Sequence, residues 1–96
     1  MTSSPLFSLA AFSAHVGTRF ALADSATLAF ELTAATPLDA QAPHDSRFSL
    51  ILRGPLQPAL DQATYTFRHA QLGELTIFIV PVGCDAAGMS YQAVFN

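Results

Sequence analysis

The stretch that decides the fold is residues 64–82, TYTFRHAQLGELTIFIVPV. Tyr65 and Phe67 alternate with polar residues, which is the two-residue period of a β-strand. Residues 70–73 can form a turn, and the same period then returns. The apolar residues on one face of the returning strand are Leu75, Ile77 and Ile79. This pattern predicts an antiparallel hairpin.

The returning strand is apolar on its other face as well, where Phe78, Val80 and Val82 alternate with the first set. Such a strand is either central in a closed or two-layer structure or lies under a partner subunit. A domain of this length has too few helices to cover both faces. We therefore predict that Phe78, Val80 and Val82 form an interface.

Strand patterns also occur on both sides of this hairpin. A second hairpin is predicted around a turn at 23–26, and a final strand follows a turn at 83–88. Another strand covers 47–53, and Gly54-Pro55 ends it because proline cannot donate to a ladder. The segments 34–46 and 55–62 have no sustained period and are predicted as irregular, with Leu56 and Leu60 pinning the second of them to the core.

One short helix is expected near the start of the chain. Ser8 is a good N-cap, apolar residues follow at helical spacing over 9–16, and Gly17 can take the left-handed conformation that ends a helix. Gly54 is also expected to hold a backbone conformation that other residues resist. Residues 1–7 are expected to be flexible.

These elements predict an all-β fold of about six mostly antiparallel strands, forming a small barrel or sandwich with one short N-terminal helix. Residues 1–96 make a single domain. Its core is predicted from the apolar phase of each strand. The predicted core residues are Phe20, Leu28, Phe30, Leu50, Leu52, Phe67, Ile77, Ile79 and Phe95.

The composition predicts an unusually neutral surface. Hydrophobic residues make up 51% of the chain and charged residues only 11%, against about 25% charged in an ordinary soluble domain. Either small uncharged residues give a weakly polar surface, or another subunit covers part of it. We favour self-association.

The charges also limit the partners. The formal net charge is −3, and the four basic residues are all arginines spread along the chain. Binding to phosphate backbones needs clustered basic residues, so nucleic acid and anionic membranes are not expected as partners. Cys84 is the only cysteine, which excludes an internal disulfide and fits a cytoplasmic setting. We expect no membrane span, because no apolar run reaches 18 residues.

No catalytic or metal-binding motif stands out. His15, His44 and His69 lack the spacing of a metal site, and no cofactor is expected. His69 lies near Glu74 across the turn, and a contact with that carboxylate would raise its pKa. Arg53 could brace a facing loop, or hold a carboxylate such as that of Asp61 or an external anion.

A familiar pattern runs through Phe12–Phe20, Phe48–Leu50, Arg53–Pro55, Tyr65 with His69, Leu72–Gly73, Phe78–Val82 and Tyr91–Asn96. Together these segments resemble a family of small bacterial proteins catalogued as a domain of unknown function. The resemblance implies that such proteins are encoded near phage-tail collar or tail-fibre-like proteins, and hence an accessory or assembly role. It implies no catalytic residues.

Three functional hypotheses follow. The first is a non-catalytic interaction or assembly module, which forms a homo-oligomer or binds a tail-like protein. The second is a small-ligand-binding β-barrel, with Arg53, Tyr65 and His69 near the pocket. The third is an enzyme, which we do not expect because no paired acid and base is found.

Overall fold

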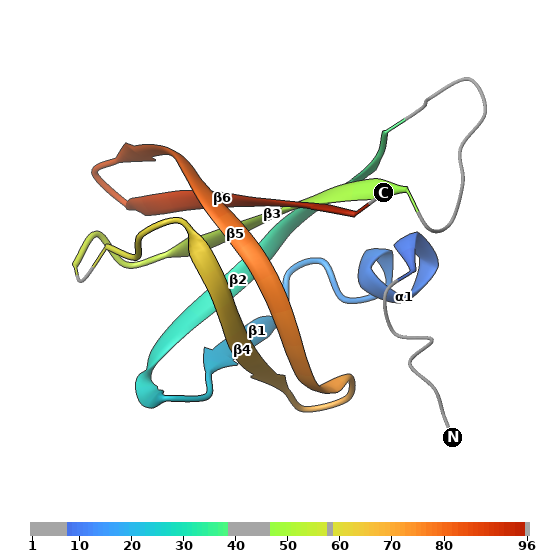
Figure 1. Cartoon of the computed structure of the whole chain (residues 1–96), viewed down its shortest axis with the longest axis horizontal. Coiled ribbons are helices and arrows are strands. Elements are labelled where there is room, and N and C mark those ends of the chain that lie inside the picture. Colours follow the sequence, from blue (N-terminus) through green and yellow to red (C-terminus); the bar gives the residue numbers. More distant parts are fainter. Residues whose placement is uncertain (1–7, 39–46, 58, 96) are drawn as a thin grey trace.

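The computed structural model describes residues 8–38, 47–57 and 59–95. Within them, one short helix precedes six strands, as Figure 1 shows. The elements are α1 (Leu9–Ser13), β1 (Arg19–Leu22), β2 (Ser25–Pro37), β3 (Phe48–Gly54), β4 (Ala63–His69), β5 (Gly73–Asp85) and β6 (Gly88–Phe95). The predicted all-β class is confirmed. The expected flexibility of 1–7 and most of the predicted loop at 34–46 lie outside the described residues.

The strands form one antiparallel sheet that closes on itself in the order β1-β2-β3-β6-β5-β4. Two long strands make the closure possible. The first part of β2 pairs with β1 and its last part with β3, while β5 pairs first with β4 and then with β6. Each long strand therefore leaves one neighbour and joins the next, and the sheet curls into a small barrel.

The seams of this barrel differ in length. β3 pairs with β6 along its whole length, from Phe48 to Gly54. β1 and β4 share only two residue pairs, Ala21 with Arg68 and Leu22 with Phe67. The β1–β4 seam is thus the shortest in the described part of the sheet.

The core lies inside the ring and largely matches the predicted one. Seven of the nine predicted residues are buried, and the other two, Leu28 and Phe95, are half-buried and pack against them. Tyr91 is completely buried, and its hydroxyl accepts a hydrogen bond from the Leu60 amide at 2.8 Å. Leu60 therefore pins its segment to the core as predicted, but Leu56 does not, because 42% of it is exposed.

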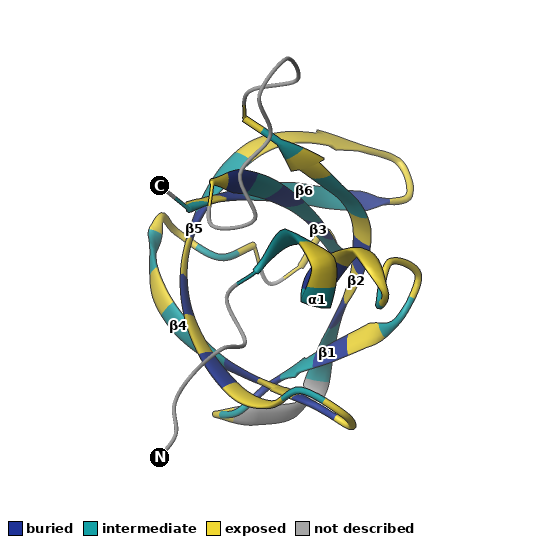
Figure 2. Ribbon diagram, turned by 90° about the vertical axis from the view of Figure 1, so that its right-hand side faces the viewer, coloured by how far each residue is buried: buried dark blue, intermediate teal, exposed yellow. Residues whose placement is uncertain are grey.

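The helix α1 lies across one mouth of the ring, as the end-on view in Figure 2 shows. Ser8 caps it as predicted, with Oγ accepting from the Ala11 amide. Phe12 is completely buried, and its ring lies 5.7 to 6.5 Å from those of three core phenylalanines. Those rings belong to Phe20, Phe48 and Phe95. Phe12 therefore anchors the helix on the barrel, and the partly buried Leu9 packs against the core beside it.

The helix ends at Ser13, so the prediction that it reaches Val16 was wrong. Val16 is 44% exposed, so its side chain makes no core contact that would stabilise a longer helix. The chain turns instead, and the Gly17 amide donates to the Leu32 carbonyl at 2.7 Å, which begins the pairing with β2. Gly17 has φ +92°, as predicted, but it ends the turn rather than the helix.

Three strand boundaries also differ from the predictions. β2 continues to Pro37 because its small residues pair by backbone with β3 even though their side chains show no alternation. Pro37 is tolerated because it ends the strand. β5 continues to Asp85, so the turn before β6 contains only residues 86 and 87. β3 begins at Phe48 rather than Arg47.

Gly54 is restricted for a different reason from the predicted one. Positive φ values occur at Gly17, Gly73 and Gly88 among the described residues, and not at Gly54. Gly54 instead faces the barrel interior, where an added Cβ would lie 2.5 Å from Cδ2 of Phe30. The constraint is therefore space rather than backbone conformation.

Candidate functional site

The outer wall of the barrel over β3, β6 and β5 is uncharged. The strand register places Ile51, Gln92 and Val80 side by side in one row, and Val94 beside Ser49 in the next. Phe78 precedes Val80 by two residues on β5 and points outward in the same phase. We call these six residues the neutral face: Ser49, Ile51, Phe78, Val80, Gln92 and Val94.

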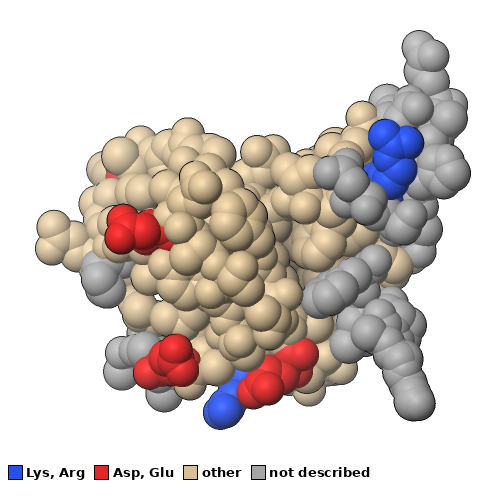
Figure 3. Space-filling model, in the orientation of Figure 1, with Lys and Arg blue, Asp and Glu red and all other residues tan. Residues whose placement is uncertain are grey.

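The neutral face exposes large apolar side chains. Phe78 is 50% exposed and Val94 is 49% exposed. In Figure 3 the middle of the visible surface, over β5, carries no charged side chain, and the charged side chains lie toward the edges of the view. An apolar centre with a charged border is the arrangement found in the core and rim of protein interfaces.

Two of the three predicted interface residues, Phe78 and Val80, belong to this face. Val82 is 52% exposed, but it lies where the β5–β6 register shifts between Pro81 and Gly83. A bulge at this point turns a side chain away from the regular phase. Val82 therefore borders the neutral face instead of continuing its rows, and the interface role of all three stays a prediction.

Sequence reasoning missed Ile51 and Val94 because it concentrated on the inward phase of their strands. The signal was present in β6, where Tyr91 and Ala93 occupy the buried phase and Val94 falls between inward residues. An apolar residue that points outward from a strand indicates a surface patch only when its neighbours on the adjacent strands are known. Those neighbours come from the closed register, which the sequence did not specify.

A row of charges borders the neutral face on the side of β1 and β2. Glu31 of β2 pairs in register with Arg19 of β1 and with Arg53 of β3. The guanidinium of Arg53 donates to the carboxylate of Asp85 at the end of β5. This charge-assisted hydrogen bond raises the pKa of Arg53 and lowers that of Asp85.

Asp85 also shapes the β5–β6 turn. Its Oδ1 accepts from the amides of Ala87 at 2.8 Å and Gly88 at 3.2 Å, which further lowers its pKa. The predicted bracing role of Arg53 thus has a partner, but the partner is Asp85 and not Asp61. The reason is topological, because β3 and β5 both pair with β6 and their ends meet there.

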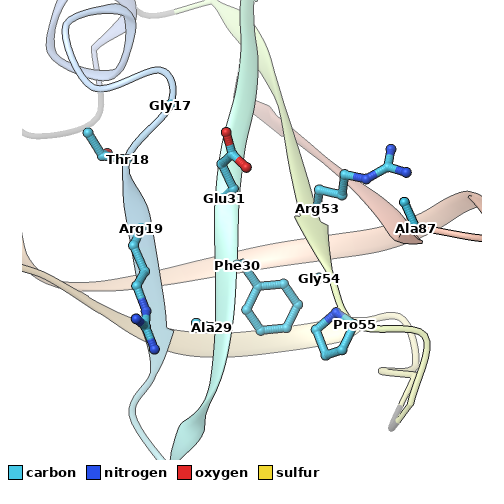
Figure 4. Close-up of a pocket in the computed structure, with 10 residues that line it drawn as sticks. All are labelled: Gly17, Thr18, Arg19, Ala29, Phe30, Glu31, Arg53, Gly54, Pro55 and Ala87. Atoms are coloured by element: carbon cyan, nitrogen blue, oxygen red, sulfur yellow. The ribbon is translucent and has the colours of Figure 1, made fainter.

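A shallow groove of about 590 Å³ lies over β1, β2 and β3. Figure 4 shows Arg19 on one side, Pro55 on the other and Ala29 between them. Arg19 has no ion-pair partner among the residues that the structure describes. The lining residues are Gly17, Thr18, Arg19, Ala29, Phe30, Glu31, Arg53, Gly54, Pro55 and Ala87.

Only one of the three residues predicted for a ligand pocket lines this groove. Arg53 is part of its wall, whereas Tyr65 and His69 lie on β4, which is not a neighbour of β3. The Tyr65 hydroxyl donates to the Asp61 carbonyl at 2.8 Å and closes its own loop. The structure therefore does not bring these three side chains together around the groove.

The predicted contact between His69 and Glu74 is absent, and the predicted direction of the pKa shift was wrong. Glu74 pairs instead with Arg68 at 3.2 Å on the exposed side of the hairpin. His69 points inward and is only 7% exposed. Burial lowers its pKa, and the nearby His15 lowers it further.

The described residues hold no group of three His, Cys, Asp or Glu side chains that could bind a metal ion. Cys84 is a free and exposed thiol. Across 8–38, 47–57 and 59–95 there is also no helix of the length and apolarity needed to cross a bilayer. The geometry thus leaves two candidate sites, the neutral face and the groove.

Residues 7–95 match the model of a domain of unknown function, DUF6916. The chain belongs to this family. The match covers all the strands, so the neutral face and the groove both lie within the DUF6916 domain. Neither the search of curated proteins nor that of solved structures gave a match.

Proposed function

We propose that this DUF6916 domain is a non-catalytic interaction module that associates with a second copy of itself through the neutral face. The observation that supports the proposal is the continuous row Ile51, Gln92 and Val80, bordered by the exposed Phe78 and Val94. No core contact requires apolar side chains at these outward positions. A partner that covers them would remove apolar surface from water.

The closed sheet restricts how two copies can meet. In the middle of the neutral face, Ile51 and Gln92 each pair with a strand on both sides, so no strand edge is free there for strand addition. Association must therefore be face to face, and a two-fold axis would place the same patch on both copies. A specific contact of this kind should bury at least about 1,000 Å² in total.

The low charge of the chain supports self-association. With a net charge of −3 and no charged residue among the six of the neutral face, two copies meet with little repulsion. Burying the exposed half of one Phe78 side chain would contribute on the order of 1 kcal/mol. Several such side chains from each copy are needed to offset the cost of association.

Light scattering coupled to size-exclusion chromatography tests the proposal with a matched pair of variants. Phe78→Asp places a charge in the neutral face and should reduce the mass to that of one chain without unfolding it. Leu56→Asp makes the same change at an exposed apolar residue outside the face and should leave the mass unchanged. A wild-type chain that stays monomeric at high micromolar concentration contradicts the homo-oligomer.

The partner could instead be a larger protein. The resemblance to a family encoded near tail-fibre-like proteins supports an accessory role to such a protein, and the same face would then bind it. A monomeric wild-type chain whose Phe78→Asp variant no longer binds a purified tail-like protein would support this form of the proposal.

The groove favours a second candidate function, the binding of a small carboxylate. Arg19 is the cation that remains available there, since the guanidinium of Arg53 already holds Asp85. A carboxylate on Arg19 could rest its apolar part on Ala29 and Pro55. Glu31 lines the same groove, so it would favour ligands that carry a hydrogen-bond donor as well as a carboxylate.

Titration with small carboxylic acids, followed by amide chemical shifts, tests this second function. Arg19→Gln should weaken binding about tenfold, as expected for the loss of one charge-assisted hydrogen bond. Arg47→Gln removes an arginine that does not line the groove and serves as the control. Equal effects of the two variants would mean that only net charge matters.

A further inference from the structure

His69 is the one buried histidine in the described part of the chain. It ends β4, directly beside the two residue pairs that form the β1–β4 seam. Its ring lies tilted against that of Phe20 of β1, with centroids 4.6 Å apart, and meets His15 edge-on at 4.7 Å. The side chain thus joins β4 to β1 and to the α1–β1 connection.

The hydrogen bonds around the ring fix its protonation state. Nδ1 accepts from the amides of Gln71 at 3.0 Å and Leu72 at 3.1 Å, so this nitrogen carries no proton. The Thr18 hydroxyl donates to the His15 carbonyl at 2.6 Å, which leaves its oxygen to accept from Nε2 of His69 at 2.9 Å. The neutral ring protonated on Nε2 satisfies every one of these bonds.

Protonation would disrupt the arrangement. A proton on Nδ1 would point at two amide hydrogens and break both bonds of the β4–β5 turn. It would also place a charge in a nearly dry site beside His15, with no carboxylate within hydrogen-bonding distance among the described residues. The nearest hairpin charges, Arg68 and Glu74, pair with each other on the outside.

We propose that the neutral His69 ring is an acid-released latch, which holds the α1–β1 connection against the β4–β5 turn and completes the shortest seam of the barrel. Backbone pairing between β1 and β4 covers two residue pairs, and the bond from His69 to Thr18 and the contact with Phe20 continue the seam beyond them. When the ring takes up a proton on Nδ1, its two bonds to the β4–β5 turn are lost and the charged ring leaves its buried site. The links to Thr18 and Phe20 go with it, and the seam opens.

The opening would reach α1. A helix of five residues is not stable by itself, and α1 depends on Phe12 and on the connection that His69 holds. Release of His15 and Thr18 would free this connection and expose Phe20 below it. The opened edges of β1 and β4 would then be available to pair with another strand, which the closed barrel forbids.

Amide hydrogen exchange on the whole chain, followed by NMR, tests the latch. Between about pH 7.5 and about pH 5.5, the protection of residues 18–22 and 67–72 should fall by up to about tenfold, after correction for intrinsic exchange rates. The amides of the β3–β6 pair should keep their protection. An equal loss in both regions, or no loss at the seam, would overturn the proposal.

Two variants and a titration complete the experiment. His69→Gln can donate to Thr18 but cannot take up a proton, so its seam should lose the acid response, whereas His15→Gln should retain it. An unchanged acid response in His69→Gln would overturn the latch. If His69→Gln does not fold, the NMR titration of the wild-type ring decides, because a pKa of His69 at or above the ordinary value of about 6.5 contradicts the proposal.

Discussion

The β3–β6 pair and the β1–β4 seam close the same barrel in different ways. β3 and β6 pair along all of β3, and their inward side chains are apolar. β1 and β4 share two residue pairs, and a polar network around His69 and Thr18 continues the contact. A long ladder with an apolar interior does not depend on protonation, and it can carry an exposed association surface. A short seam completed by side chains depends on the state of one ring.

Removing a core ring that both regions share should give the largest effect. Phe30 is completely buried and contacts the rings of Phe67 on β4 and Tyr91 on β6. Phe30→Ala should destabilise the fold by about 3 to 5 kcal/mol through lost burial and a residual cavity. Chemical denaturation measures this loss, and an unchanged midpoint would show that the ring does not link the two sides of the barrel.

Overpacking at the end of the long ladder should cost less. Gly54→Ala would place a methyl group against the Phe30 ring and should destabilise the fold by about 1 to 3 kcal/mol. Gly83→Ala is the matched control, because an added Cβ there meets nothing within 4 Å. Equal denaturation midpoints for Gly54→Ala and Gly83→Ala would contradict the close approach of Phe30 to Gly54.

Acid should weaken the seam before it weakens the ladder. The pKa of His69 is lowered in the folded chain, so the unfolded chain binds the proton more tightly. The stability that comes from the neutral ring is therefore complete above about pH 6.5 and is lost as the pH falls from there to the folded-state pKa. Denaturation midpoints across this range should fall in the wild type and stay level in His69→Gln.

The Arg53–Asp85 pair should have the smallest effect, because solvent screens it: the side chain of Asp85 is 61% exposed and that of Arg53 is 32% exposed. The pKa of Asp85 is lowered, so its contribution is present above the ordinary carboxyl value of about 4 and is lost as the pH falls through the folded-state pKa. Asp85→Asn should remove this part of the acid profile and leave unchanged the part near the ordinary histidine pKa of about 6.5. If Asp85→Asn also changed the stability profile in the histidine range, the Arg53–Asp85 pair and His69 would be coupled.

The sequence predicted the strand phases well because alternation reports directly which side chains face the core. It predicted the inward direction of Phe20, Phe67 and Ile77, and it placed Phe78 and Val80 outside. It could not predict that β2 and β5 each pair with two neighbours in turn, since pairing depends on backbone groups that residue identity does not specify.

The candidate sites were harder to predict than the fold. His69 lies next to Arg68 and near Glu74 in the sequence, which suggested an exposed ion pair. The strand phase places His69 inside with Phe67 and leaves Arg68 and Glu74 outside. The hydrogen bond to Thr18 and the ring contact with Phe20 join segments far apart in the sequence, since 51 positions separate His69 from Thr18. Only the closed topology brings such segments together.

The most direct test of the account is a dilution series of the wild-type chain, followed by amide chemical shifts and by molar mass. We predict that the mass falls from that of a dimer to that of one chain on dilution. The amides of Ile51, Phe78, Val80, Gln92 and Val94 should shift with it, while those of the β1–β4 seam stay in place at neutral pH. A constant single-chain mass with no shift at the neutral face, or shifts confined to another surface, would contradict the claim that this face is where two copies meet.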